Sequence, residues 1–228
     1  MVSIPFIDLH THSDRIEKGI VTIRNIYPGE SFAAFSGRNF YSVGLHPWHI
    51  KSEKENNEML RMIENALDFD HVCFIGECGL DKISVTDFEE QKRVFYAQAL
   101  MAEEFEKPLI IHCVKAYNEI LEFRNEIHPN MPWIMHGYNS SIEQTIKMAE
   151  TGILFSFGEN LYRPNSKAVE SFRHLPLEKI FFETDEYDGN VQCMYEKGAE
   201  LKHIPVENLI EAVWNNFSRV ENKLLSRF

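Results

Sequence analysis

The stretch Ile4-Pro5-Phe6-Ile7-Asp8-Leu9-His10-Thr11-His12 lies close to the start of the chain. Its first four residues form an apolar run that predicts a buried strand. Because side chains alternate along a strand, Asp8, His10 and His12 are expected to point the same way. Two imidazoles so spaced can bind one metal ion, with an acid nearby to orient one of them. A polar strand end with solvated histidines is the alternative that these residues leave open.

Apolar runs of strand length recur along the whole chain. Most are continuous rather than alternating, which is typical of parallel strands covered on both faces. Segments with helical spacing of apolar residues lie between them. Strands that alternate with helices predict parallel βα units, and eight of them predict an α/β fold with a TIM-like (β/α)8 barrel. The eight runs are Ile4–Leu9, Ile20–Ile26, Phe40–Leu45, Val72–Ile75, Leu109–Ile111, Trp133–Met135, Ile153–Phe157 and Ile180–Phe182.

The predicted barrel is abbreviated in its first two βα units. Only Ser13 to Gly19 separate the first two runs, which is too short for a full crossover helix. Gly29–Asn39 has room for about two helical turns at most. Nothing in the sequence indicates a domain boundary, so residues 1–228 are expected to form a single domain. The longest irregular-looking stretch, Glu186–Pro205, is a candidate lid or rim.

The composition limits the possible partners. The chain has 35 acidic and 23 basic residues, for a net charge of −12, which argues against a protein that coats nucleic acid through a wide basic surface. A nuclease whose metal ions supply local positive charge remains compatible with it. We find no signal peptide, no run of membrane-spanning length and no disulfide or zinc spacing among the four cysteines. The chain is therefore expected to be cytoplasmic, without contact to a membrane.

Histidines and acids gather directly after the predicted strands. In a (β/α)8 barrel the carboxyl ends of the strands form one rim, where active sites are built, so residues far apart in sequence meet there. Imidazole and carboxylate bind divalent ions, and a carboxylate can bridge two of them. A core or rim role is a fair alternative for any one histidine, but it does not account for the set. The residues at the strand ends are His10, His12, His46, Glu77, His112, His136 and Asp185.

Taken in order, these residues resemble the TatD-type metal-dependent deoxyribonucleases of the metallo-dependent hydrolase superfamily, over nearly the whole chain. The most distinctive piece is Gly76-Glu77-Cys78-Gly79-Leu80-Asp81, which matches G-E-x-G-L-D. Each piece alone is a weak signal, and the ordered set is a specific one. The other pieces are Asp8-Leu9-His10-Thr11-His12, Gly44-Leu45-His46-Pro47, Gln91, Leu109-Ile110-Ile111-His112, Met135-His136-Gly137, Glu183-Thr184-Asp185 and Asn216-Phe217.

The resemblance implies a hydrolase with two divalent metal ions bridged by Glu77. Glu77 and Asp185 are the implied catalytic residues, and Asp185 would also accept a proton from the attacking water. The histidine-rich ligand set suits Zn, Mn or Ni, whereas the resemblance points to Mg. One ion is expected to bind His10, His12, Glu77 and Asp185, and the other Glu77, His112 and His136.

Asp8, His46 and Lys115 are expected to face the substrate or to support the metal ligands. Several neighbouring positions depart from the family's pattern, namely Lys82, Val114-Lys115, Gly137-Tyr138-Asn139-Ser140 and Glu186-Tyr187-Asp188. A DNA end is the leading substrate class, and a smaller phosphodiester is the second. Trp48 is expected to be a packed loop aromatic, with stacking on a base as the alternative.

Three other functions stay open. A PHP-type phosphoesterase also opens with D-L-H-T-H, but the intact G-E-C-G-L-D and the late E-T-D argue against it. Many amidohydrolase-like enzymes that cleave C–N bonds have a modified lysine after the fourth strand, where this chain has Glu77. A non-catalytic metal-binding barrel is disfavoured because a structural site needs no exposed acid such as Asp185 beside an open metal position.

Overall fold

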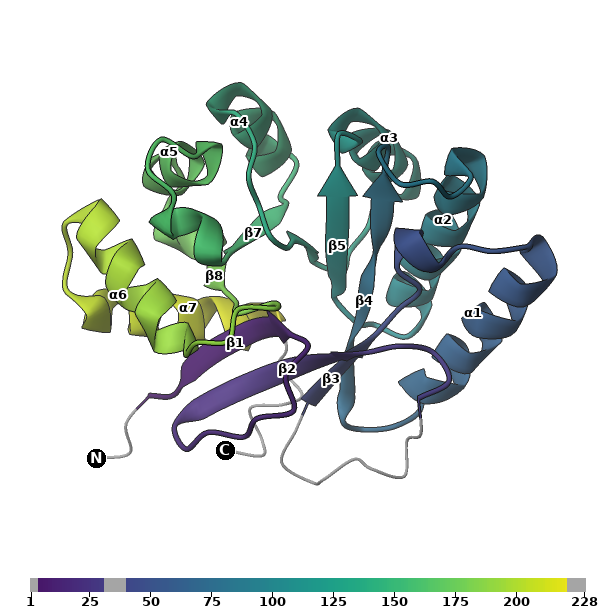
Figure 1. Cartoon of the computed structure of the whole chain (residues 1–228), viewed down its shortest axis with the longest axis horizontal. Helices are drawn as coiled ribbons and strands as arrows, with labels where there is room; N and C mark the ends of the chain where they lie inside the picture. The colour runs from purple at the N-terminus through teal and green to yellow at the C-terminus, as the bar shows by residue number, and fades with distance from the viewer. Residues whose placement is uncertain (1–3, 31–39, 221–228) are drawn as a thin grey trace. The chain divides into compact units, whose positions relative to one another are not determined.

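The computed structural model describes residues 4–30 and 40–220 of the chain. Strands alternate with helices along most of this length (Figure 1). All eight strands occur in one sheet, in the order in which they follow one another along the chain. The strands are β1 (Phe6–Thr11), β2 (Ile20–Ile26), β3 (Phe40–Val43), β4 (Val72–Asp81), β5 (Leu109–Val114), β6 (Trp133–Met135), β7 (Leu154–Phe157) and β8 (Ile180–Phe182).

The predicted strands are therefore present, and two of them are longer than their apolar runs. β4 continues through Glu77 to Asp81, and β5 continues through His112, so both residues lie within strands rather than after them. The helices are α1 (Glu53–Leu67), α2 (Phe88–Glu104), α3 (Tyr117–Ile127), α4 (Ile142–Glu150), α5 (Lys167–His174), α6 (Val191–Lys202) and α7 (Val206–Val220), with 3₁₀ turns η2 (Pro47–His49), η3 (Glu159–Tyr162) and η4 (Leu177–Lys179). None of these described helices is long and apolar enough to cross a membrane.

The first βα unit is abbreviated as expected, since residues 13–19 contain no helix. The prediction for Gly29–Asn39 falls mostly on residues 31–39, which lie outside the described part of the chain. The interpretation of Glu186–Pro205 as irregular is wrong for most of its length, because it contains α6. Gly198 hid the helical pattern, and it is needed there because a Cβ would lie 2.7 Å from the ring of Phe182.

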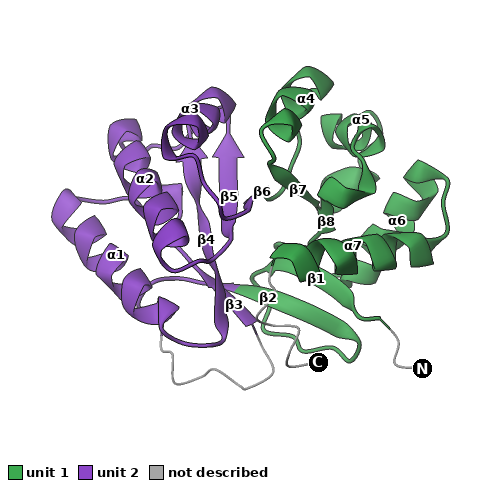
Figure 2. Ribbon diagram, turned by 180° about the vertical axis from the view of Figure 1, so that it is seen from behind, with its two compact units in different colours: residues 1–24, 135–228 green, residues 25–134 purple. Residues whose placement is uncertain are grey.

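The chain divides into two compact units (Figure 2). Unit 1 comprises residues 1–24 and 135–228, and unit 2 comprises residues 25–134. In unit 1, β1 pairs with β2 and β7 with β8, all in parallel. The end of β1 also pairs with the chain after β8, because Asp185 N donates to His10 O over 2.9 Å and His12 N donates to Asp185 O over 3.2 Å. In unit 2, β3, β4 and β5 pair in parallel.

Local signals explain where the main helices begin. Ser52 and Glu55 form a reciprocal capping box that starts α1, and the Asp87 carboxylate accepts a hydrogen bond from Glu90 N at the start of α2. In unit 1, α7 buries Leu209, Val213 and Phe217 along one face, as helical spacing predicts.

β4 and β5 approach each other closely at Gly79, which pairs with His112 in the strand register. Gly79 has a φ of +153°, and a Cβ at this position would lie 1.9 Å from His112 O. Glycine therefore leaves the space that the backbone of His112 occupies.

Replacing Gly79 by alanine is expected to lower the free energy of unfolding by about 3 kcal/mol, because the backbone contact cannot relax without moving β5. Gly19→Ala is the matched control: Gly19 also has a positive φ, +84°, but nothing lies within 4 Å of its added Cβ. That control should lose only about 1 kcal/mol. Chemical denaturation measures both variants, and equal losses would show that the close contact is not what matters.

Candidate metal centre

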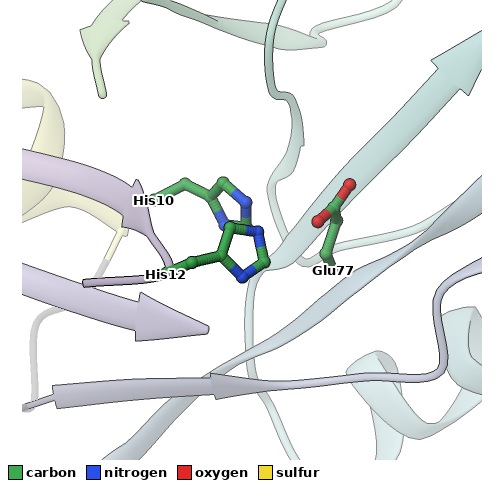
Figure 3. Close-up of side chains that lie close together, drawn as sticks. All are labelled: His10, His12 and Glu77. Atoms are coloured by element: carbon green, nitrogen blue, oxygen red, sulfur yellow. The ribbon is translucent and has the colours of Figure 1, made fainter. Parts of the chain in front are cut away.

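Unit 1 brings histidine and aspartate side chains together at the end of β1. His10, His136 and Asp185 each offer a ligand atom, and these atoms all lie within 4.8 Å of one another. The rings of His10 and His136 have centroids 4.5 Å apart. His12 adjoins this group, because its Nε2 lies 3.5 Å from Asp185 Oδ1. Figure 3 shows the rings of His10 and His12 projecting from the end of β1 to the same side, with centroids 5.1 Å apart.

The Asp185 carboxylate reaches this cluster because its backbone is held in an unusual conformation. Its φ is +55°, in the left-handed region that non-glycine residues rarely adopt. The two backbone hydrogen bonds to β1 hold the residue there. Its side chain remains 40% exposed, whereas that of His10 is fully buried. The unit 1 cluster, which we define as His10, His12, His136 and Asp185, therefore has one acid that solvent can reach.

Asp8 binds Thr184, the residue directly before Asp185. Its carboxylate accepts hydrogen bonds from Thr184 N over 2.9 Å and from Thr184 Oγ1 over 2.7 Å. Burial raises the pKa of Asp8 to about 7, although the bonds from Thr184 act in the opposite direction. Asp8 thus supports the segment that carries Asp185, a partner that the alternation along β1 did not reveal.

Glu183 is a residue to which sequence reasoning gave no role. It is fully buried, its Oε1 lies 3.5 Å from His136 Nδ1, and it accepts a hydrogen bond from Gly137 N over 2.5 Å. Burial alone would raise the pKa of Glu183, but the hydrogen bond and charge of His136 hold it below its usual value. The signal was present, since Glu183 directly follows the apolar run Ile180–Phe182.

Unit 2 holds a second cluster, in which Glu77 lies between two histidines. Glu77 Oε1 is 3.1 Å from His46 Nε2 and 2.9 Å from His112 Nδ1. The Glu77 side chain, labelled in Figure 3, is almost completely buried. The backbone N of Glu77 donates a hydrogen bond to Asn25 Oδ1 over 2.6 Å. We call His46, Glu77 and His112 the unit 2 cluster. His46, expected to face the substrate or to support the ligands, thus lies among the possible ligands themselves.

Asp81 supports the unit 2 cluster as Glu183 supports His136. Its Oδ2 lies 3.5 Å from His112 Nε2 and accepts a hydrogen bond from Trp48 Nε1 over 2.6 Å. Burial would raise the pKa of Asp81, but the hydrogen bonds from Trp48 and Ile83 N lower it overall. Asp81 is the last residue of the G-E-x-G-L-D motif, and the sequence predicted no role for it. Trp48 is exposed, which differs from the packed loop aromatic that we expected.

The remaining sequence predictions are less closely tied to these clusters. Lys115 is exposed directly after β5, with a φ of +56°, and its role near a substrate stays a prediction. The predicted ligand sets combine Glu77 of unit 2 with residues of unit 1, and these sets also stay predictions.

The donor sets fit divalent metal ions. Each cluster combines at least two imidazoles with one carboxylate, which are ligands that Zn²⁺, Mn²⁺ and related ions accept. In each cluster a further carboxylate lies 3.5 Å from a ring nitrogen of one histidine. Glu183 is this partner for His136, and Asp81 is this partner for His112. Metal-binding histidines commonly have such a partner, which fixes the ring and increases its basicity.

A cavity of about 360 Å³ in unit 1 borders the unit 1 cluster, and His12 and Asp185 line its wall. Glu186, Tyr187 and Asp188, where the chain departs from the family's pattern, also line it. Two contacts tie its walls together, from Arg15 to Asp188 and from Asn190 to Glu17. Because Asp185 is exposed and lines this cavity, its carboxylate is accessible to small molecules from the cavity.

Comparisons with known proteins agree with this chemistry. Residues 29–222 match the family described as TatD-related DNase. A metal-dependent hydrolase of Haemophilus influenzae is 29% identical over 68% of this chain and 62% of its own length. A 3′–5′ ssDNA/RNA exonuclease of Pectobacterium carotovorum is 26% identical over 63% of this chain and 56% of its own length. The chain thus matches less than two thirds of either relative.

The fold is also that of a solved structure. The crystal structure of a TatD homologue from Escherichia coli superposes with a TM-score of 0.83 and 22% identity, covering 95% of this chain and 98% of the other. This similarity confirms the predicted TIM-like (β/α)8 fold class.

Replacing Glu183 by glutamine is expected to weaken metal binding by the unit 1 cluster about tenfold to a hundredfold, because His136 loses its charged partner. Calorimetric titration of the purified protein with Mn²⁺ or Zn²⁺ measures the affinity. Glu178→Gln is the control, since Glu178 is exposed on η4, before β8 rather than after it. Unchanged affinity in a folded Glu183→Gln protein would refute the supporting role.

Proposed function

Because the chain belongs to the TatD-related DNase family, we propose that it is a metal-dependent hydrolase that cleaves phosphodiester bonds, most specifically a TatD-like deoxyribonuclease. The observation that carries this proposal is the composition of the two clusters, each of which joins imidazoles to a carboxylate and has a buried acid behind one ring. The match to the TatD-related DNase family and the similarity to nucleases support the choice of phosphoric esters.

We propose that each cluster binds one divalent ion, so that the chain binds two. His10, His12, His136 and Asp185 would hold one ion, and His46, Glu77 and His112 the other. Bound divalent ions supply Lewis acidity, which lowers the pKa of water and stabilises negative charge on phosphoryl oxygens. Mg, Mn, Zn and Ni are the candidates, and the histidine-rich donor sets favour the last three.

Asp185 is the proposed proton acceptor. Its carboxylate is the exposed acid of the unit 1 cluster and lines the cavity. Its position depends on its neighbours: Asp8 holds Thr184 through two hydrogen bonds, and β1 holds the backbone of Asp185. The strained backbone conformation is consistent with a functional residue kept in place by its surroundings.

The substrate we propose is the end of a single- or double-stranded DNA, with a smaller phosphodiester as the second choice. A net charge of −12 disfavours contact with a long stretch of phosphate backbone. An enzyme that binds a chain end needs fewer such contacts, and the Pectobacterium relative is named as an exonuclease. Location in the cytoplasm stays a prediction from the sequence.

Hydrolysis of a DNA oligonucleotide should require metal and should slow strongly when Asp185 is changed. We expect chelation to abolish cleavage, added Mn²⁺ or Mg²⁺ to restore it, and Asp185→Asn to lower kcat by about 10² to 10⁴ because the proton acceptor is lost. His174→Ala is the control, since His174 is exposed at the end of α5. A small phosphodiester and an amide complete the panel, and cleavage of the amide alone would reject the proposal in favour of C–N hydrolysis.

Metal analysis should find about two ions per chain. His136→Ala and His46→Ala are each expected to leave about one ion, because each variant loses a ligand of a different cluster. Glu77→Ala separates this assignment from the bridge that the sequence resemblance implies: loss of one ion, as with His46→Ala, fits a ligand of one cluster, whereas loss of both ions fits a bridge. Elemental analysis after dialysis gives the stoichiometry, and full occupancy in all three variants would contradict the assignment.

A further inference from the structure

Trp48 is a large aromatic residue that stays exposed next to the unit 2 cluster. It lies in η2, directly after His46 and Pro47. It is 61% exposed, whereas Trp133 in the same unit is completely buried. Leaving an indole in water forgoes the free energy that its burial would provide, so its position beside a candidate metal site needs a reason.

One edge of the indole is fixed by residues of the site. Its Nε1 donates to Asp81 Oδ2 over 2.6 Å. The Trp48 ring centroid lies 4.9 Å from that of His46 and 5.9 Å from that of His112, with the rings edge to face in both cases. The indole is therefore oriented by Asp81 and by the two histidines that would bind metal, while much of its surface remains open.

The loop behind Trp48 makes this arrangement stiff. Asp81 also accepts a hydrogen bond from Ile83 N over 2.9 Å through Oδ1, and Thr86 Oγ1 donates to Pro47 O over 2.8 Å. Together with the bond from Trp48 to Asp81, these contacts tie η2 to the end of β4 and to the loop that follows it. A ring held in place before a ligand arrives loses little conformational entropy on binding.

We propose that Trp48 is the stacking surface for the nucleobase next to the scissile phosphodiester. This inference rests on the proposed function. Stacking on Trp48 would allow a strongly acidic protein to bind the end of a nucleic acid. Stacking of a base on an aromatic ring needs no positive surface and tolerates any base sequence. The chain has a net charge of −12, which repels phosphate groups. Stacking on Trp48 would add affinity for the nucleic acid, because this contact is made with an uncharged base.

A comparison of two oligonucleotides tests this role. One carries bases throughout, and the other has abasic sites at its terminal nucleotides. Trp48→Ala is expected to raise KM about tenfold for the first and to leave KM for the second unchanged, because only the first loses stacking. Trp48→Phe keeps a ring and should raise KM less. Phe69→Ala is the control, since Phe69 is another exposed aromatic of unit 2, located between α1 and β4.

Tryptophan fluorescence gives a measurement without turnover. In an Asp185→Asn background, a short oligonucleotide should quench part of the emission, and the added change Trp48→Phe should remove this quenching while Trp133 and Trp214 still emit. Equal effects of Trp48→Ala on both oligonucleotides, or equal quenching with and without Trp48, would overturn the inference. If the wild type cleaves neither oligonucleotide, the proposed function fails, and the fluorescence titration still decides whether Trp48 stacks on bases.

Discussion

Two backbone hydrogen bonds hold Asp185 beside His10 and His12 at the end of β1. Asp185 N donates to His10 O, and Asp185 O accepts from His12 N, so the residue after β8 lies in register with the strand end that carries both histidines. Main-chain pairing brings the side chains together without requiring them to attract one another. This matters because the clustered groups include acids whose charges repel, Asp8, Glu183 and Asp185 among them. The pairing also keeps Asp185 in a left-handed conformation that it would rarely adopt alone.

In unit 2 the corresponding constraint is steric. β4 and β5 can place Glu77 and His112 within 2.9 Å of each other only if the strands approach closely, and Gly79 opposite His112 permits that approach. The rigidity of a strand pair then defines the geometry of the cluster, as expected when functional side chains stand on regular elements and not on loops.

The acids behind the histidines connect the fold to the chemistry. Glu183 and Asp81 are almost completely buried, and each lies 3.5 Å from a ring nitrogen. A buried carboxylate is unfavourable unless it is paired or hydrogen-bonded, so these acids are stabilised by the groups that they orient. Asp81 also accepts a hydrogen bond from the exposed Trp48, and it thereby connects the unit 2 cluster to the residue that we assign to base binding.

The sequence by itself determined the order of the strands and of most helices, the family and the types of ligand, since these depend on local periodicity and on short motifs. It did not determine which side chains meet. Asp8 binds Thr184, which lies 176 residues further along the chain, and His46 lies beside Glu77 within the unit 2 cluster. α6 was missed because Gly198 weakens its pattern, and only the rings of Phe172 and Phe182 explain that glycine. Only the tertiary structure decided these partners. Contact between distant residues depends on the register of paired strands and on the space between packed elements, and no local sequence pattern encodes either of them.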